Sequence, residues 1–168
     1  MKRDYIEFQE RNAPVAYMIT FRCYGTWLQG DERGSVDRKS FNRFGTPKIE
    51  PNVELEDRNS RRLKQNPYRL DPRERSVVEG AIKEVCRVRE YNLYGLNVRS
   101  SHVHVVIAYS GALERVMDSF KTYATRALRA AGMLETDEKA WSRHGSTKYL
   151  WTDDEVASAL DYVLYSQD

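Results

Sequence analysis

The hydrophobic pattern of the chain alternates between a period of two residues, typical of strands, and a period of three to four, typical of helices. Residues 15–23 are expected to form a half-buried strand, because apolar and polar side chains alternate along them. The elements expected after it are a helix over 71–91, strands over 94–98 and 102–109, a helix over 112–131, a short strand over 148–151 and a final helix from Thr152. This order is the split β-α-β pattern of a ferredoxin-like antiparallel sheet, an α+β fold, with one extra C-terminal helix.

Capping residues and apolar stripes indicate the two long helices. Asp71 can cap the first helix, Pro72 suits its first turn, and Glu74 completes a capping box. The second helix is expected to turn an apolar stripe inward, made of Leu113, Val116, Met117, Phe120, Ala124 and Leu128. In a ferredoxin-like fold both helices cover one face of the sheet. The other face is then available for a ligand, a partner or the extra helix.

The connection over residues 24–70 shows little regular periodicity and is broken by glycines and prolines. A connection of this length within a domain is usually functional, flexible or both. With 168 residues, the chain is expected to form one domain, 1–168, that carries a long insertion at about 24–70.

The net charge of +2 neither requires nor excludes a nucleic-acid partner, so the distribution of charge matters more than its sum. One local excess of basic residues favours a solvated loop and helix start over a phosphate-contacting edge; it consists of Arg61, Arg62, Lys64, Arg69, Arg73 and Arg75. No apolar run approaches the roughly 20 residues that span a bilayer, and no secretory signal is recognisable. Cys23 and Cys86 are expected to be small buried side chains in a reducing cytosol.

Two of the three histidines lie one residue apart in the segment SSHVHVVI, residues 100–107. Residues two apart on a strand project from the same face, so His102 and His104 are expected to stand together while Val103 and Val105 enter the core. Two imidazoles placed in this way can bind one divalent metal ion. The alternative is a pair of partly exposed strand histidines, and the motif alone does not decide between them.

The final helix offers a possible partner group for such a metal. Tyr162 and Tyr165 lie away from its apolar stripe, so at least one of them is expected to face away from the main packing surface; the stripe is Val156, Leu160, Val163 and Leu164. A tyrosine oxygen beside a metal-bound phosphate is a covalent nucleophile. The alternative is that both tyrosines pack or form hydrogen bonds at the surface.

At this point the chain resembles a known family. His102-Val103-His104 resembles the HUH motif of single-strand DNA nucleases, and the chain is similar to the single-tyrosine transposases of small insertion sequences, the REP-associated subgroup above all. The resemblance is carried by six segments in order: YMITFRCYGTWLQGDERGSVDR, NPYRLDPRERSVVEGAI, SSHVHVVI, SFKTYATRAL, WSRHGSTKYLW and ALDYVLYSQ.

The resemblance implies the HUH endonuclease fold and metal-dependent cleavage and strand transfer of single-stranded DNA. His102 and His104 would hold Mg²⁺ or Mn²⁺, and Tyr162 would form a 5′-phosphotyrosine link and release a 3′-hydroxyl. A glutamine four residues after the tyrosine completes the metal site in well-known members. Here Ser166 occupies that position, and Gln167, the candidate third ligand, lies about 140° round an ideal helix from Tyr162. Tyr165 is the second candidate for the nucleophile.

The expected DNA-contacting residues are cationic or aromatic. Arg22 and Thr20 are expected on the same sheet face as the histidines. The other candidates for DNA contact are Lys121, Arg126 and Arg129 on the second long helix, and His144. Aromatic side chains of the long segment can stack on unpaired bases or pack in the core; they are Tyr24, Trp27 and Phe44.

Two other functions remain open from the sequence. One is a zinc hydrolase in which His102, His104 and His144 hold a metal that activates water. The other is a single-strand nucleic-acid-binding module without catalysis. For the transposase-like reading, the expected partner is single-stranded DNA with hairpin-forming repeats or element ends. The protein is expected to act in the bacterial cytoplasm as a monomer or homodimer, without a membrane.

Overall fold

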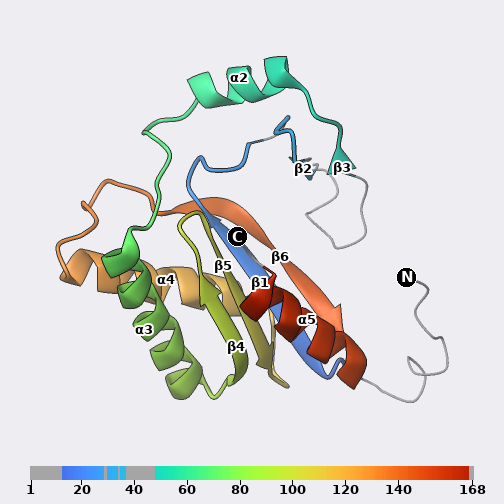
Figure 1. The fold of residues 1–168 in the computed structure, drawn as a ribbon. Coiled ribbons are helices and arrows are strands. Elements are labelled where there is room, and N and C mark those ends of the chain that lie inside the picture. The colour runs from blue at the N-terminus through green and yellow to red at the C-terminus, as the bar shows by residue number, and fades with distance from the viewer. Residues whose placement is uncertain (1–12, 29, 34, 37–47, 167–168) are drawn as a thin grey trace.

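A computed structural model describes residues 13–28, 30–33, 35–36 and 48–166 of the chain. Within them, four strands form one antiparallel sheet in the order β4-β5-β1-β6 (Figure 1). The strands are β1 (Ala16–Cys23), β4 (Asn92–Val98), β5 (His102–Ala108) and β6 (Trp141–Leu150). Two helices, α3 (Pro72–Arg89) and α4 (Val116–Ala130), connect them in the predicted order. The ferredoxin-like α+β fold predicted from the sequence is confirmed.

Helices α3 and α4 pack together on one face of the sheet and enclose the main core. Side chains from the two inner strands, such as Phe21 and Val105, meet the apolar stripe of α4 there. The predicted cap of α3 is present: the Glu74 amide donates to Asp71 at 2.8 Å, and the Glu74 carboxylate accepts from the Asp71 amide at 2.7 Å. Cys23 and Cys86 are buried free thiols.

The last helix, α5 (Asp153–Tyr165), lies across the opposite face of the sheet (Figure 1). Ala159 and Val163 pack against Ala16, Val106 and Leu150 in a second, smaller core. Leu164, which the sequence placed on this apolar stripe, is instead 44% exposed. The smaller core therefore occupies only part of this sheet face, where the strand residues are apolar.

Two features of β4 allow α5 to lie close to the sheet. Gly95 has no side chain at the point where a Cβ atom would come within 2.6 Å of Leu160. Asn97 donates a hydrogen bond of 2.7 Å from its side-chain amide to the backbone oxygen of Val163. That oxygen belongs to the last turn of α5, where carbonyl groups lack partners within the helix.

Strand β6 is longer than predicted, because it begins at Trp141 and not at 148. Among the described strands it pairs with β1 alone, at the edge of the sheet, and most of its residues are partly or fully exposed. An edge strand with polar residues on both faces gives no alternating hydrophobic signal, so the sequence reveals only its last, apolar residues. Helix α4 likewise begins at Val116, four residues later than expected.

The connection after β1 contains regular structure that the sequence pattern did not predict. It holds the helix α2 (Val53–Arg61) and a two-stranded pairing of β2 (Ser35–Val36) with β3 (Lys48–Ile49). Asn52 caps α2 by accepting a 3.0 Å hydrogen bond from the Leu55 amide. No residue of α2 is buried, so the helix lacks the apolar stripe by which helices are recognised. None of the described helices is long and apolar enough to cross a membrane.

We expect Gly145→Ala to destabilise the fold. A Cβ atom at Gly145, in β6, would lie 2.4 Å from the Thr20 carbonyl oxygen, and backbone cannot move aside cheaply. The free energy of unfolding should fall by about 1–3 kcal/mol in urea denaturation. Gly80→Ala is the matched control, because Gly80 is an exposed position in α3 with open space around its Cα. It should stabilise by about 0.5–1 kcal/mol. Equal effects of the two substitutions would contradict this packing of β6.

We also expect Asn97→Ala to loosen the last turn of α5. Loss of a hydrogen bond worth about 1 kcal/mol should speed hydrogen exchange of the amides at residues 163–166 by roughly fivefold. Asn92→Ala, at the exposed start of the same strand, should leave these rates unchanged. Unchanged exchange in both variants would show that Asn97 does not hold this turn.

Candidate functional site

The two histidines of β5 project from the sheet face on which α5 lies. Val103, Val105 and Ile107 point the other way and are fully buried in the main core, as the alternation predicts. His102 pairs with Arg22 of β1, and His104 pairs with Thr20. Residues paired across neighbouring strands share a face. The side chains of Thr20, Arg22, His102 and His104 therefore form one polar patch. It lies on the same sheet face as the apolar area that α5 covers, next to that area.

The imidazole rings are close together, and hydroxyl groups orient both. Their centroids are 4.8 Å apart. His104 is 4% exposed, and its Nδ1 lies 2.7 Å from the Thr20 hydroxyl oxygen. The Nδ1 atom of His102 lies 3.0 Å from the hydroxyl of Ser101. A hydroxyl partner at Nδ1 restrains the orientation of the ring and occupies that nitrogen, which leaves Nε2 as the ligand position. A metal ion held by these rings would therefore bind their Nε2 atoms.

The donor set around this pair fits a metal ion that takes two imidazoles and completes its shell with other oxygens. Among the described residues, no group of three His, Cys, Asp or Glu side chains is placed to hold a metal. His144 lies exposed on β6 and does not form a metal-binding trio with His102 and His104. The three-histidine zinc site considered from the sequence is thus not formed here. Gln167, the expected third ligand, lies outside the described residues.

Tyr162 is the tyrosine that lies beside the histidine pair. Its ring centroid is 5.6 Å from that of His104, and 45% of the residue is exposed. Tyr165 is 80% exposed, so it projects into solvent. Packing of Ala159 and Val163 against the sheet sets the rotation of α5 and turns Tyr162 towards the polar patch. A half-exposed phenol beside two imidazoles can reach both a bound ligand and solvent.

Arg22 adds a positive charge to the same patch. Its guanidinium carbon lies 3.5 Å from the ring centroid of Trp27. Burial lowers the pKa of Arg22 to about 10; the charge of Arg33 lowers it too, and Tyr162 and Asp31 act in the opposite direction. Arg22 therefore stays cationic at neutral pH. Trp27 is half-buried, and its ring packs against this arginine.

The structure does not bring the other predicted cations to the histidine pair. Lys121, Arg126 and Arg129 are on α4, which covers the opposite face of the sheet. Lys121 donates 2.9 Å from Nζ to the Ser142 carbonyl oxygen, and burial lowers its pKa. Arg129 donates to the carbonyl oxygen of Thr136 at 2.9 Å. DNA contact by these three residues and by His144 stays a prediction.

The structure describes two of the three aromatic residues that were predicted to stack on bases or pack in the core. Tyr24 packs against the main core, and its hydroxyl accepts a 3.0 Å hydrogen bond from the Lys64 amide. Trp27 carries the guanidinium groups of Arg22 and Arg33. Phe44 lies outside the described residues. Of the basic residues between 61 and 75, all but the half-buried Arg75 are exposed, which fits a solvated loop and helix start.

Sequence reasoning placed Thr20 on the sheet face of the histidines, but it did not predict the contacts that support this site from a distance. Thr20, Ser101 and Asn97 orient the histidines and the end of α5, and Arg33 reaches the ring of Trp27. Ser101 directly precedes His102, so this contact could have been predicted from the sequence. The others are brought in by pairing between distant segments, for which a single sequence carries no signal.

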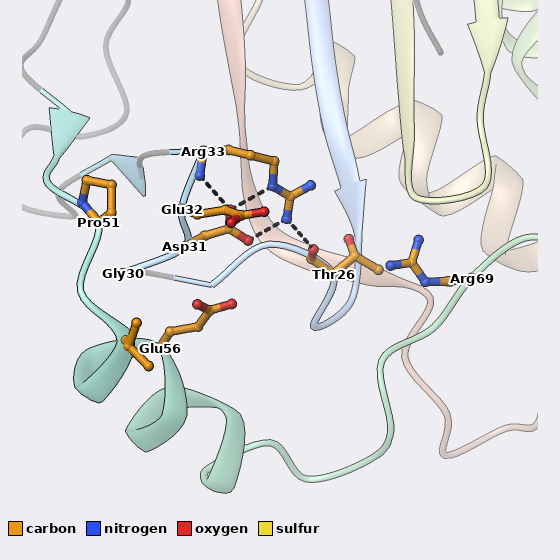
Figure 2. Close-up of a pocket in the computed structure, with 9 residues that line it drawn as sticks. Thr26, Gly30, Asp31, Glu32, Arg33, Pro51, Glu56 and Arg69 are labelled. Carbon is orange, nitrogen blue, oxygen red and sulfur yellow. Dashed lines mark hydrogen bonds and ion pairs between the residues drawn. The ribbon is translucent and has the colours of Figure 1, made fainter.

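A separate hollow of about 400 Å³ lies between the loop after β1 and helix α2 (Figure 2). Its lining combines carboxylates with two arginines: Thr26, Gly30, Asp31, Glu32, Arg33, Pro51, Val53, Glu56 and Arg69. Neither histidine nor Tyr162 lines it. This hollow is therefore not where the histidine pair and tyrosine meet.

The solved structures that match this chain include a protein described as a REP-associated tyrosine transposase bound to a REP hairpin. The two are 11% identical, the TM-score is 0.48, and the alignment covers 97% of this chain and 69% of that chain. At this level the similarity does not establish a shared function. No curated protein matches the chain.

A family model described as "Transposase IS200 like" matches residues 62–159. The matched segment contains His102 and His104 and ends three residues before Tyr162. Since it spans more than half of the chain, the chain belongs to the IS200-like transposase family.

Proposed function

We propose that the protein cleaves and rejoins single-stranded DNA, with Tyr162 as the nucleophile and His102 and His104 as ligands of a divalent metal, Mg²⁺ or Mn²⁺. The observation that carries the proposal is the contact between the rings of Tyr162 and His104, on the face where His102 and Arg22 also lie. A nucleophile, two metal-binding groups and a cation in one patch are the components that phosphoryl transfer requires.

In the proposed reaction, the Tyr162 oxygen attacks a phosphorus atom of the DNA backbone. The bond from phosphorus to the 3′ oxygen breaks, and that oxygen leaves as a 3′-hydroxyl after taking a proton from solvent. The phenolic proton is released to solvent, and the 5′-phosphate stays on Tyr162. Attack by a 3′-hydroxyl reverses these changes and joins two strands without an external energy source.

The other side chains of the patch prepare this step. Thr20 and Ser101 hold the imidazoles with Nε2 towards the phosphate position, and Arg22 supplies a fixed positive charge. A divalent metal, when bound, polarises the phosphate and stabilises charge on the leaving oxygen. Gln167 is proposed as its third protein ligand.

The proposed substrate is single-stranded DNA that folds into hairpins, either at the ends of an element or at dispersed repeats. This part of the proposal rests on the resemblance to REP-associated transposases. The exposed phenol of Tyr162 is compatible with it, since a flexible strand can approach from solvent.

We expect Tyr162→Phe to abolish a covalent protein–DNA adduct that the wild-type protein forms with hairpin DNA from the flanks of its own gene. The DNA is labelled at the 3′ end, because the protein would keep the 5′-phosphate of the downstream strand. With Mn²⁺ or Mg²⁺, the adduct should survive SDS gels and should fall by roughly 10³-fold or more in the variant. His104→Ala and chelation by EDTA should also lower it.

Tyr165→Phe is the matched control, because Tyr165 is on the same helix but projects into solvent. It should form the adduct at the wild-type rate. Loss of the adduct in Tyr165→Phe, with retention in Tyr162→Phe, would reassign the nucleophile. Tight DNA binding without any adduct would favour the binding module. Stoichiometric zinc that is lost in His144→Ala would favour the hydrolase.

A further inference from the structure

The loop that follows β1 returns to the histidine face and supports Arg22 there. Arg22 is the penultimate residue of β1, and Trp27 follows in the loop with its ring under the Arg22 guanidinium, 3.5 Å from the guanidinium carbon. The guanidinium carbon of Arg33 lies 4.0 Å from the centroid of the same ring. Stacking on tryptophan restrains an arginine and leaves its N–H groups able to donate.

Arg33 is itself fixed by two groups of the loop, the Asp31 carboxylate and the Thr26 carbonyl (Figure 2). Its guanidinium forms an ion pair with Asp31 and donates to the Thr26 carbonyl oxygen at 3.1 Å. The backbone amide of Arg33 also donates to Asp31, at 2.9 Å. Asp31 is 5% exposed, and its hydrogen bond from Arg33 holds its pKa below the usual value. A buried carboxylate with this partner anchors the loop at neutral pH.

The arrangement also resolves a charge problem. Two guanidinium groups on one ring repel each other, and Arg22 is half-buried as well. The Asp31 carboxylate offsets the charge of Arg33, so the pair places a nearly neutral group behind Trp27. The unbalanced positive charge is then that of Arg22, which pairs with His102 across β1 and β5 on the sheet face where Tyr162 contacts His104.

We propose that Trp27, Arg33 and Asp31 are positioning residues that hold the Arg22 guanidinium beside Tyr162, where it donates to a non-bridging oxygen of the phosphate under attack. This inference rests on the proposed function and assigns the loop after β1 to the active site. The charge on those oxygens increases in the transition state, so a fixed guanidinium contributes more to the rate than to ground-state binding.

The test separates binding from chemistry. Affinity for the hairpin DNA is measured by fluorescence anisotropy in the Tyr162→Phe background, and adduct formation is measured under single-turnover conditions with Tyr162 present. Trp27→Leu should lower the single-turnover rate roughly tenfold and change affinity less than twofold. Trp27→Phe, which keeps an aromatic face, should recover most of the rate. Trp151→Leu is the matched control, because Trp151 lies just before the N-terminus of α5, at the other end of the helix from Tyr162. It should leave the rate unchanged.

A double-mutant cycle tests whether the loop acts through Arg22. Arg33→Ala should slow the reaction in the wild-type background and have no further effect in Arg22→Ala. Arg33→Gln serves as a second, milder variant if Arg33→Ala melts early. Arg87→Ala, an exposed arginine of α3, controls for loss of one positive charge. Additive effects of Arg22→Ala and Arg33→Ala would overturn the proposal, as would equal losses of affinity and rate.

A readout independent of activity distinguishes this inference from the proposed function. The Arg22 Nε–H signal in NMR spectra should be shifted by the ring current of Trp27 and should move to an ordinary position in Trp27→Leu and in Arg33→Ala. An Arg22 signal that is unchanged in both variants would overturn the positioning role, whatever the rates. Absence of any adduct in the wild-type protein would instead count against the proposed function, while the signal still tests the packing.

Discussion

The apolar contact between α5 and the sheet determines where Tyr162 lies relative to the histidine pair. Ala159 and Val163 are buried against Val106 and its neighbours, and Gly95 leaves room for Leu160. This contact uses only part of the sheet face. The rest is polar because β1 and β5 change from apolar to polar residues at the same level. Tyr162 lies at that boundary, so one helix both completes the fold and carries the proposed nucleophile.

Local patterns in the sequence predicted the parts of the site that belong to single elements. The alternation in residues 102–107 placed both imidazoles on one face, and the stripe on the last helix left Tyr162 and Tyr165 outside it. The order of elements predicted the sheet. In contrast, the hydroxyl that orients His104 comes from Thr20, 84 residues earlier in the chain, and no local pattern indicates such a partner.

The remaining differences have the same kind of cause. Strand β6 and helix α2 lack a buried face, so hydrophobic periodicity underestimates the first and misses the second. The cations on α4 were predicted to contact DNA because of their charge. The structure places α4 on the sheet face opposite to the histidine pair, and Lys121 of this helix donates to a backbone oxygen of β6. The sequence did not predict a role for Arg33, because that role depends on a contact through another residue. The guanidinium groups of Arg22 and Arg33 both pack on the ring of Trp27.

The central claim of the proposal is that the polar patch on the sheet, which contains His102 and His104, binds a catalytic metal beside Tyr162. Anomalous diffraction from crystals grown with Mn²⁺ tests it most directly, because the signal locates the ion without assumptions about its ligands. The account predicts one strong peak within bonding distance of Nε2 of both His102 and His104. Crystals that contain Mn²⁺ but show no peak between these two nitrogens would contradict it.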